Sequence, residues 1–142
     1  MRVVFEPAEP SPEIRQAILT EIRAFNARLF KDERPGRDLA IALRDPGTNE
    51  IVGGLWGRTA GGWLVIELIF VPEALRGQGV ASRLVAMAEA EALARDCHAA
   101  WLDTLNPEAL RLYERLGYRR FGELKDYPRG GSRYFLEKRL AG

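Results

Sequence analysis

A short glycine-containing segment is the first part of the chain with the character of a binding site. Residues 76–82 read Arg-Gly-Gln-Gly-Val-Ala-Ser and lie between an apolar run and the start of a helical pattern. The first N–H groups of a helix have no intrahelical acceptor, and the helix dipole adds partial positive charge, so this turn predicts a site for diphosphate. The candidate contacts are Arg76, Gly77, Gln78, Gly79, Val80, Ala81 and Ser82.

The same segment also has a structural interpretation, because a turn from strand to helix can need glycine for its backbone geometry alone. Two other nucleotide motifs do not fit it. A Walker A loop needs Gly-Lys followed by Ser or Thr, and a dinucleotide fingerprint needs a third Gly or Ala where Ser82 stands. Both of these motifs are therefore disfavoured.

Two ionisable side chains stand where they could take part in proton transfer. Glu67 is the only charge in the apolar run WLVIELIFV, residues 63–71, and we expect burial there to suit it to the role of general base. A structural carboxylate paired with an arginine is the alternative. Tyr113 shares a helical face with apolar neighbours, so it is either a packed aromatic or a general acid. Cys97 and His98 are interpreted as structural.

The elements that position these residues follow from hydrophobic periodicity and from turn- and helix-forming residues. The pattern predicts strands at 2–6, 38–44, 51–57, 63–71, 99–104, 118–124 and 133–139. Helices are expected at about 12–30 and 78–95 and from Pro107 to Gly117. Two of them open with an N-cap, a proline and an acid, in Ser11-Pro12-Glu13 and Asn106-Pro107-Glu108. The order predicts one α/β or α+β domain, residues 1–142, with antiparallel strand pairs at both ends of its sheet.

Two motifs together resemble the GNAT superfamily of acetyl-CoA-dependent N-acetyltransferases. Arg76, Gly79 and Ala81 match the family's phosphate-loop signature, and Asn106 and Tyr113 fit its second signature, in the right order along the chain. The resemblance covers the whole chain loosely and residues 63–122 closely. It implies a strongly twisted mixed sheet with helices on both faces. Its fourth and fifth strands, here 63–71 and 99–104, would splay apart to receive the pantetheine arm of coenzyme A.

The resemblance also implies roles for single residues. Backbone groups of Ile69 and Val71 would pair with the pantetheine arm, Asn106 would hydrogen-bond it, and Tyr113 would be the general acid at the thioester sulfur. A helix-capping role for Asn106 is equally compatible with its sequence context. Strand alternation would place Glu67 on the face of Ile69 and Val71, toward the reacting end of the arm. The implied reaction is direct attack of a primary amine on acetyl-CoA in a ternary complex, with no covalent intermediate and no metal.

The amino-acid composition limits the kinds of partner that we expect the protein to bind. The 21 Lys and Arg residues against 20 Asp and Glu residues give a formal charge of +1, so no overall field favours nucleic acid or anionic lipid. One cysteine and one histidine leave no ligand set for a structural zinc, and no run approaches the roughly 20 apolar residues of a membrane span. We expect a cytoplasmic protein that binds neither nucleic acid nor membrane. By family resemblance, a homodimer is possible.

The alternative function is that of a protein that has the phosphate loop but does not catalyse acetyl transfer. Such a protein would be a catalytically silent acyl-CoA-binding or regulatory module, and the presence of Tyr113 weighs against it. A nucleotide-binding switch is disfavoured by the missing Walker lysine. The acceptor amine stays open among small molecules, peptides and proteins. Release of the coenzyme A thiol in the presence of an amine separates these classes.

Overall fold

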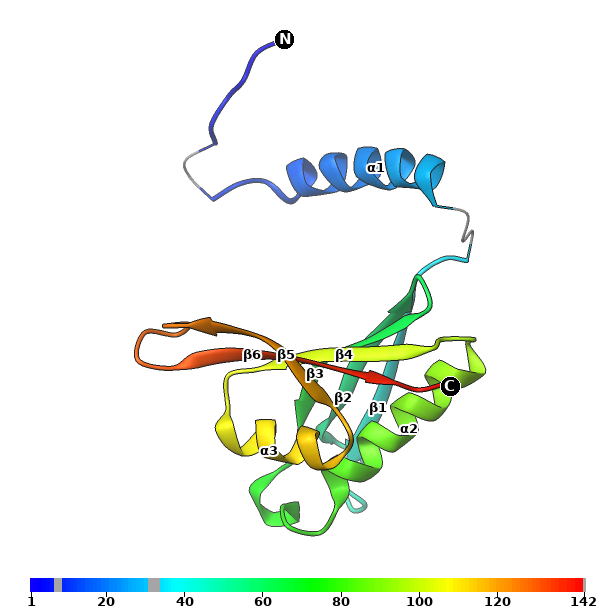
Figure 1. Ribbon diagram of the computed structural model, residues 1–142, viewed down its shortest axis with the longest axis vertical. Coiled ribbons are helices and arrows are strands. Elements are labelled where there is room, and N and C mark those ends of the chain that lie inside the picture. The colour runs from blue at the N-terminus through cyan, green and yellow to red at the C-terminus, as the bar shows by residue number, and fades with distance from the viewer. Residues whose placement is uncertain (7–8, 31–33, 142) are drawn as a thin grey trace. The chain divides into compact units, whose positions relative to one another are not determined.

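The computed structural model describes residues 1–6, 9–30 and 34–141, which fall into two units that are described separately. The first, Met1–Arg34, contains the helix α1 (Pro12–Leu29; Figure 1). The Ser11 hydroxyl accepts a hydrogen bond from the N–H of Glu13 at 3.2 Å, and Pro12 occupies the first turn, as its sequence predicts. The expectation of a single domain over residues 1–142 stays a prediction.

The strand predicted at residues 2–6 is wrong, because residues 1–6 carry no regular secondary structure. The apolar composition of this segment is typical of a strand, but a strand also needs a neighbouring strand to satisfy its backbone N–H and C=O groups. The described part of the first unit offers only a helix. Apolar composition alone was therefore not sufficient to predict a strand in this segment.

The second unit, Pro35–Gly142, is built on a six-stranded mixed sheet with the strand order β1-β2-β3-β4-β6-β5 (Figure 1). Strands β3 and β4 pair in parallel, and the remaining neighbours pair antiparallel, so the predicted mixed sheet with hairpins at both ends is confirmed. The strands are β1 (Arg37–Arg44), β2 (Ile51–Ala60), β3 (Trp63–Phe70), β4 (Ala99–Thr104), β5 (Arg119–Lys125) and β6 (Ser132–Arg139).

Two helices and one 3-10 turn connect these strands. The turn η1 (Glu73–Leu75) and the helix α2 (Val80–Ala94) form the crossover that a parallel pair such as β3 and β4 requires. The helix α3 (Pro107–Arg115) connects β4 to β5. Gly117, just beyond its C-cap, has a φ of 97°, the left-handed conformation predicted there. Among the described residues, no helix is long and apolar enough to cross a membrane.

The parallel pair β3 and β4 separates partway along its length. Their ladder runs from Trp63 opposite Ala99 to Ile66 opposite Leu102. Beyond that point β3 continues beside β2 as far as Phe70, whereas β4 continues beside β6 through Thr104. The β4-facing edge of residues 67–70 is therefore without a strand partner in the described structure. This confirms the splayed strands expected from the sequence.

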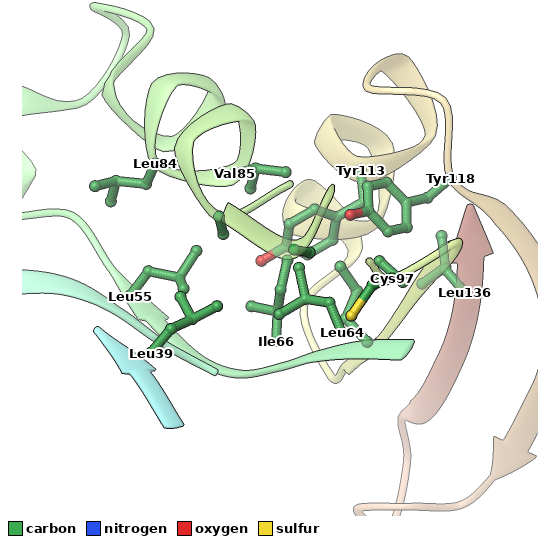
Figure 2. Packing of buried hydrophobic residues seen from close by; sticks show 14 of the residues in the cluster. Leu39, Leu55, Leu64, Ile66, Leu84, Val85, Cys97, Tyr113, Tyr118 and Leu136 are labelled. Carbon is green, nitrogen blue, oxygen red and sulfur yellow. The ribbon is translucent and has the colours of Figure 1, made fainter. Parts of the chain in front are cut away.

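The core lies between the sheet and the helices α2 and α3, whose buried side chains belong to one cluster. Figure 2 shows these side chains filling the space beneath the two helices. Leu64, Val85, Leu102 and Leu136 are its largest fully buried members, and each contributes about 1.5–3 kcal/mol on burial. Cys97 is also buried there, in agreement with a structural role.

Candidate active site

A cleft of about 670 Å³ lies where the free end of β3, the start of α2 and one side of α3 meet. It brings together most of the residues predicted from the two sequence motifs, although these lie far apart in the chain. Glu67 and Gln78 are the predicted site residues that do not line it. The predicted residues that do are Ile69, Val71, Arg76, Gly77, Gly79, Val80, Ala81, Ser82, Asn106 and Tyr113.

The loop before α2 has the geometry of an anion cradle. Gly77 and Gly79 both have φ values of 77°, a conformation that residues with a side chain rarely adopt. A Cβ atom at either glycine would meet no atom within 4 Å, so the space beside them is open. Within the described structure no group accepts a hydrogen bond from the N–H groups of Val80, Ala81 or Ser82. Such N–H groups at a helix N-terminus suit a diphosphate.

Arg76 and Gln78 fold back onto the protein next to this cradle. The Nε of Arg76 donates to the carbonyl of Val71 at 3.1 Å, and its guanidinium lies 5.9 Å from the centre of the Phe70 ring. Arg76 thus fixes the end of β3 and still lines the cleft. The Nε2 of Gln78 donates to the carbonyl of Ala74 at 3.2 Å, so this side chain holds the loop.

Asn106 caps α3 and also lines the cleft. Its Oδ1 accepts a hydrogen bond from the N–H of Glu108 at 2.9 Å, which is the N-cap of α3. No acceptor among the described residues binds its side-chain N–H₂ group, and Asn106 lines the cleft. The cap fixes the amide while leaving its donor side available to a ligand.

Tyr113 is both a core residue and a cleft residue. Only 4% of its surface is exposed, and burial raises the pKa of its phenol to about 12. Its hydroxyl has no hydrogen-bond partner among the described residues, yet none of their buried side-chain oxygen or nitrogen atoms is left unpaired. The oxygen therefore reaches the cleft, where it can donate a hydrogen bond to a bound molecule.

The expectation that Glu67 is buried is wrong. A β-bulge interrupts the β2–β3 ladder, because Gly57 pairs with Ile66 and Trp56 pairs with Leu68, which leaves Glu67 as the extra residue. The regular alternation assumed from Glu67 to Ile69 therefore does not hold. The Glu67 side chain is exposed at the point where β3 and β4 separate. Its carboxylate has no partner among the described residues and faces solvent rather than an apolar strand interior.

Sequence reasoning missed cleft residues on α3. Leu112 and Arg115 line the cleft together with Glu108, and all three lie on one side of the helix at spacings of four and three residues. Helical spacing from Glu108 could have identified them. Among the described residues, no three histidine, cysteine, aspartate or glutamate side chains gather closely enough to hold a metal ion.

Comparison with known proteins places this arrangement among acetyltransferases. The sequence pattern of the Acetyltransferase (GNAT) family matches residues 5–118, a range that contains both motifs of the cleft. Acetyltransferase Atu2258 of Agrobacterium fabrum is 49% identical over 128 residues, which are 90% of this chain and 92% of that protein. Blasticidin-S acetyltransferase of Streptomyces morookaense is 38% identical over 92 residues, 64% of this chain and 68% of that protein.

A solved structure shares the fold over nearly the whole length. The crystal structure of an Agrobacterium tumefaciens protein described as an acetyltransferase superposes with a TM-score of 0.89 at 46% sequence identity. The match covers 98% of this chain and 99% of that chain. The mixed sheet and its connecting helices are thus features that this chain has in common with that crystal structure.

Proposed function

Because this chain belongs to the GNAT acetyltransferase family, we propose that it transfers the acetyl group of acetyl-CoA to a primary amine within a ternary complex. The observation that carries the proposal is the cleft itself. It joins an open anion cradle, an accessible phenol, and a strand edge and an amide donor that have no partners among the described residues. These are the groups that a long thioester with a diphosphate would need along its length.

The described residues fit acetyl-CoA in a definite order along the cleft. The N–H groups of residues 80–82 would bind the diphosphate, and the edge at Ile69 and Val71 would pair with the pantetheine amides. Asn106 would donate its free amide hydrogens to the same arm. Acetyl-CoA supplies the activated acyl group as a thioester. The coenzyme A thiol is the leaving group of the transfer.

Tyr113 would act on the leaving sulfur mainly as a hydrogen-bond donor. With a pKa of about 12 it stays protonated at neutral pH. Full proton transfer to a thiolate of pKa about 8.5 would be uphill by about 5 kcal/mol, at about 1.36 kcal/mol for each pKa unit. Stabilising the developing negative charge needs only the hydrogen bond. Burial thus makes Tyr113 a weaker acid, and its hydroxyl stays protonated and able to donate a hydrogen bond.

The acceptor must lose a proton before or during the attack. An amine of pKa about 10.4 is almost wholly protonated at pH 7, and reaching its free base costs about 4.6 kcal/mol. We assign the removal of this proton to Glu67 through solvent, because its carboxylate is exposed where β3 leaves β4. Deprotonation of the amine in bulk water is the alternative, and a Glu67→Gln variant with wild-type turnover at neutral pH would favour it.

The acceptor class stays open among small-molecule, peptide and protein amines. The relative named for blasticidin S makes that compound the first acceptor to test. A cytoplasmic location and a homodimeric state also stay predictions. The catalytically silent acyl-CoA-binding module remains the second candidate, and it is distinguished by binding acetyl-CoA without releasing its thiol.

The test is release of coenzyme A thiol from acetyl-CoA in the presence of single amines. The panel contains blasticidin S, a peptide with a free lysine and a blocked N-terminus, and a peptide with a free N-terminus and no lysine. We expect one class to give thiol release together with an amine product heavier by one acetyl group. Binding of acetyl-CoA with no product from any amine would favour the silent module.

A further inference from the structure

Three polar side chains, from α2, from β6 and from the residue just before β5, meet outside the cleft lining. Tyr118, which follows α3, donates its hydroxyl to Oε2 of Glu89 on α2 at 2.8 Å. The Nζ of Lys138 on β6 donates to both oxygens of the same carboxylate, at 3.0 and 3.2 Å. The exposed fractions are 3% for Tyr118 and 14% and 27% for the side chains of Glu89 and Lys138. We name these three residues the tyrosine anchor.

The tyrosine anchor is joined directly to Tyr113. The N–H of Tyr118 donates to the carbonyl of Tyr113 at 3.0 Å, and the N–H of Gly117 donates to the carbonyl of Glu114 at 3.1 Å. This pair of bonds is a Schellman motif, in which the residue two beyond the helix end also packs on the third-last helical residue. Here that packing is an edge-to-face contact of the two tyrosine rings, with centroids 6.2 Å apart (Figure 2).

The helix that carries Tyr113 depends on such attachments. With 9 residues, α3 is shorter than the roughly 12–15 residues at which an isolated helix becomes marginally stable in water. Its N-terminus is fixed by the Asn106 cap, and its C-terminus by the Schellman motif. The tyrosine anchor ties that second end to α2 and β6, which both contribute buried side chains to the core.

Stability alone is a weak reason for such a network. The Glu89–Lys138 ion pair is partly exposed, and such pairs contribute little to stability because solvent screens the charges and the side chains lose mobility. Burial first, and then the negative charge of Glu89, raise the pKa of the Tyr118 phenol well above its usual value. Tyr118 therefore stays a hydrogen-bond donor, and its ring keeps one orientation against Tyr113.

We propose that the tyrosine anchor, residues Glu89, Tyr118 and Lys138, is a positioning device that holds the Tyr113 hydroxyl at the acyl end of the cleft. This rests on the proposed function, in which Tyr113 donates to the thioester sulfur. The three residues touch neither reactant; they act through the ring and backbone of Tyr113. Loosening them would misplace the hydroxyl while leaving the anion cradle intact, since the cradle is built by residues 76–82.

The test is a double variant that removes the charges but keeps the volume, Glu89→Leu with Lys138→Met. Tyr118 then has a hydroxyl without an acceptor, while no charge is left unpaired. We expect a folded protein whose melting temperature is lowered by the unpaired Tyr118 hydroxyl, an unchanged KM for acetyl-CoA and a fall in kcat of about tenfold, which equals about 1.36 kcal/mol. Asp38→Asn, which breaks the exposed pair with Arg58, is the matched control and should leave kcat unchanged.

The decisive readout repeats the double variant in a Tyr113→Phe background. If the anchor acts through the Tyr113 hydroxyl, removing the anchor from a protein that already lacks this hydroxyl should change kcat by no more than about twofold. The proposal would be overturned if the double variant lowered kcat by the same factor with Tyr113 present and in the Tyr113→Phe background, or if it left kcat unchanged when Tyr113 was present. Tyr118→Phe serves in the same cycle if the double variant does not fold. Wild-type turnover in Tyr113→Phe alone would show that the Tyr113 hydroxyl takes no part in the reaction, and the positioning role would fall while acetyl transfer stood. Absence of acetylated product from the wild type with every amine would instead contradict the proposed function.

Discussion

At the scale of single residues, the cleft is defined by groups with unsatisfied hydrogen-bonding capacity. The phenol of Tyr113, the amide hydrogens of Asn106 and the N–H groups at the start of α2 have no partners among the described residues. Each of them belongs to a residue that lines the cleft, so it is available to a bound molecule. Their convergence on one cleft is the strongest residue-level argument for a bound ligand.

Replacing Tyr113 with phenylalanine tests the role of its hydroxyl. The ring and its packing in the core are kept, so the cofactor surface should be preserved. We expect kcat to fall by about 10²-fold, the lower range for groups that assist proton transfer, with KM for acetyl-CoA changed little. Steady-state kinetics with the best amine of the panel gives both values. A wild-type kcat in the Tyr113→Phe variant would show that Tyr113 serves only as a packed aromatic side chain.

The two buried tyrosines also predict how stability depends on alkaline pH. Burial raises the pKa of Tyr113 to about 12 and that of Tyr118 still higher, so the folded state holds both protons longer than the unfolded state does. Their contribution is complete below pH 10, the unfolded value, and is lost as the pH rises through the folded value. For Tyr113 this loss is about 3 kcal/mol between pH 10 and 12.

Urea unfolding measured at several pH values checks this dependence. The free energy of unfolding of the wild type should fall steeply above pH 10. Tyr113→Phe should show a shallower fall, since one of the two titrating groups is missing. Equal slopes for both proteins would show that the Tyr113 phenol titrates as it does in the unfolded chain.

At the scale of elements, the sequence predicted the helices and strands well because their signals are local. Both N-caps, at Ser11 and Asn106, and the left-handed stop at Gly117 lie within a few residues of the ends they define. The bulge at Glu67 could not be predicted in this way, because it depends on how β2 and β3 align. The tyrosine anchor joins residues 29 and 49 positions apart, so no local pattern revealed it.

The start of α2 predicts the effect of a side chain in the anion cradle. Gly79→Glu places a negative carboxylate beside the N–H groups that would bind diphosphate. Acetyl-CoA at 100 times its Kd should stabilise the wild type by about 2.7 kcal/mol, and the variant should lose this stabilisation. Gly130→Glu is the matched control, because Gly130 has a similar φ of 82° and equally open surroundings outside the cleft. Thermal unfolding with and without acetyl-CoA measures both.

The end of α2 predicts a different effect, on stability alone. The Nη1 of Arg95 donates to the carbonyls of Arg37 and Asp38 and to the Thr59 hydroxyl, which ties the helix to β1 and β2. Arg95→Met leaves these acceptors without their donor, and we expect a loss of about 2–4 kcal/mol in urea unfolding. Arg119→Met, which breaks an exposed ion pair, should lose less than about 1 kcal/mol. Equal losses of stability in the two variants would show that the Arg95 hydrogen bonds contribute no more than an exposed ion pair.

At the scale of the whole molecule, family membership and the splayed sheet explain why distant motifs share one cleft. The parallel pair β3 and β4 needs a crossover, and α2 with its glycine loop is that crossover. The separation of the strands beyond Ile66 then exposes the edge that faces α3. The sequence motifs implied this geometry by resemblance, whereas the acceptor depends on side chains that no motif specifies.

The most direct test of the central claim follows thiol and product in the same reaction. Acetyl-CoA and the best amine of the panel are mixed with the wild type, Gly79→Glu or Gly130→Glu, and free thiol and acetylated amine are quantified together by mass spectrometry. We predict equal amounts of both from the wild type and Gly130→Glu, and neither from Gly79→Glu. Wild-type product formation by a folded Gly79→Glu protein would contradict the assignment of this cleft as the site of acetyl transfer.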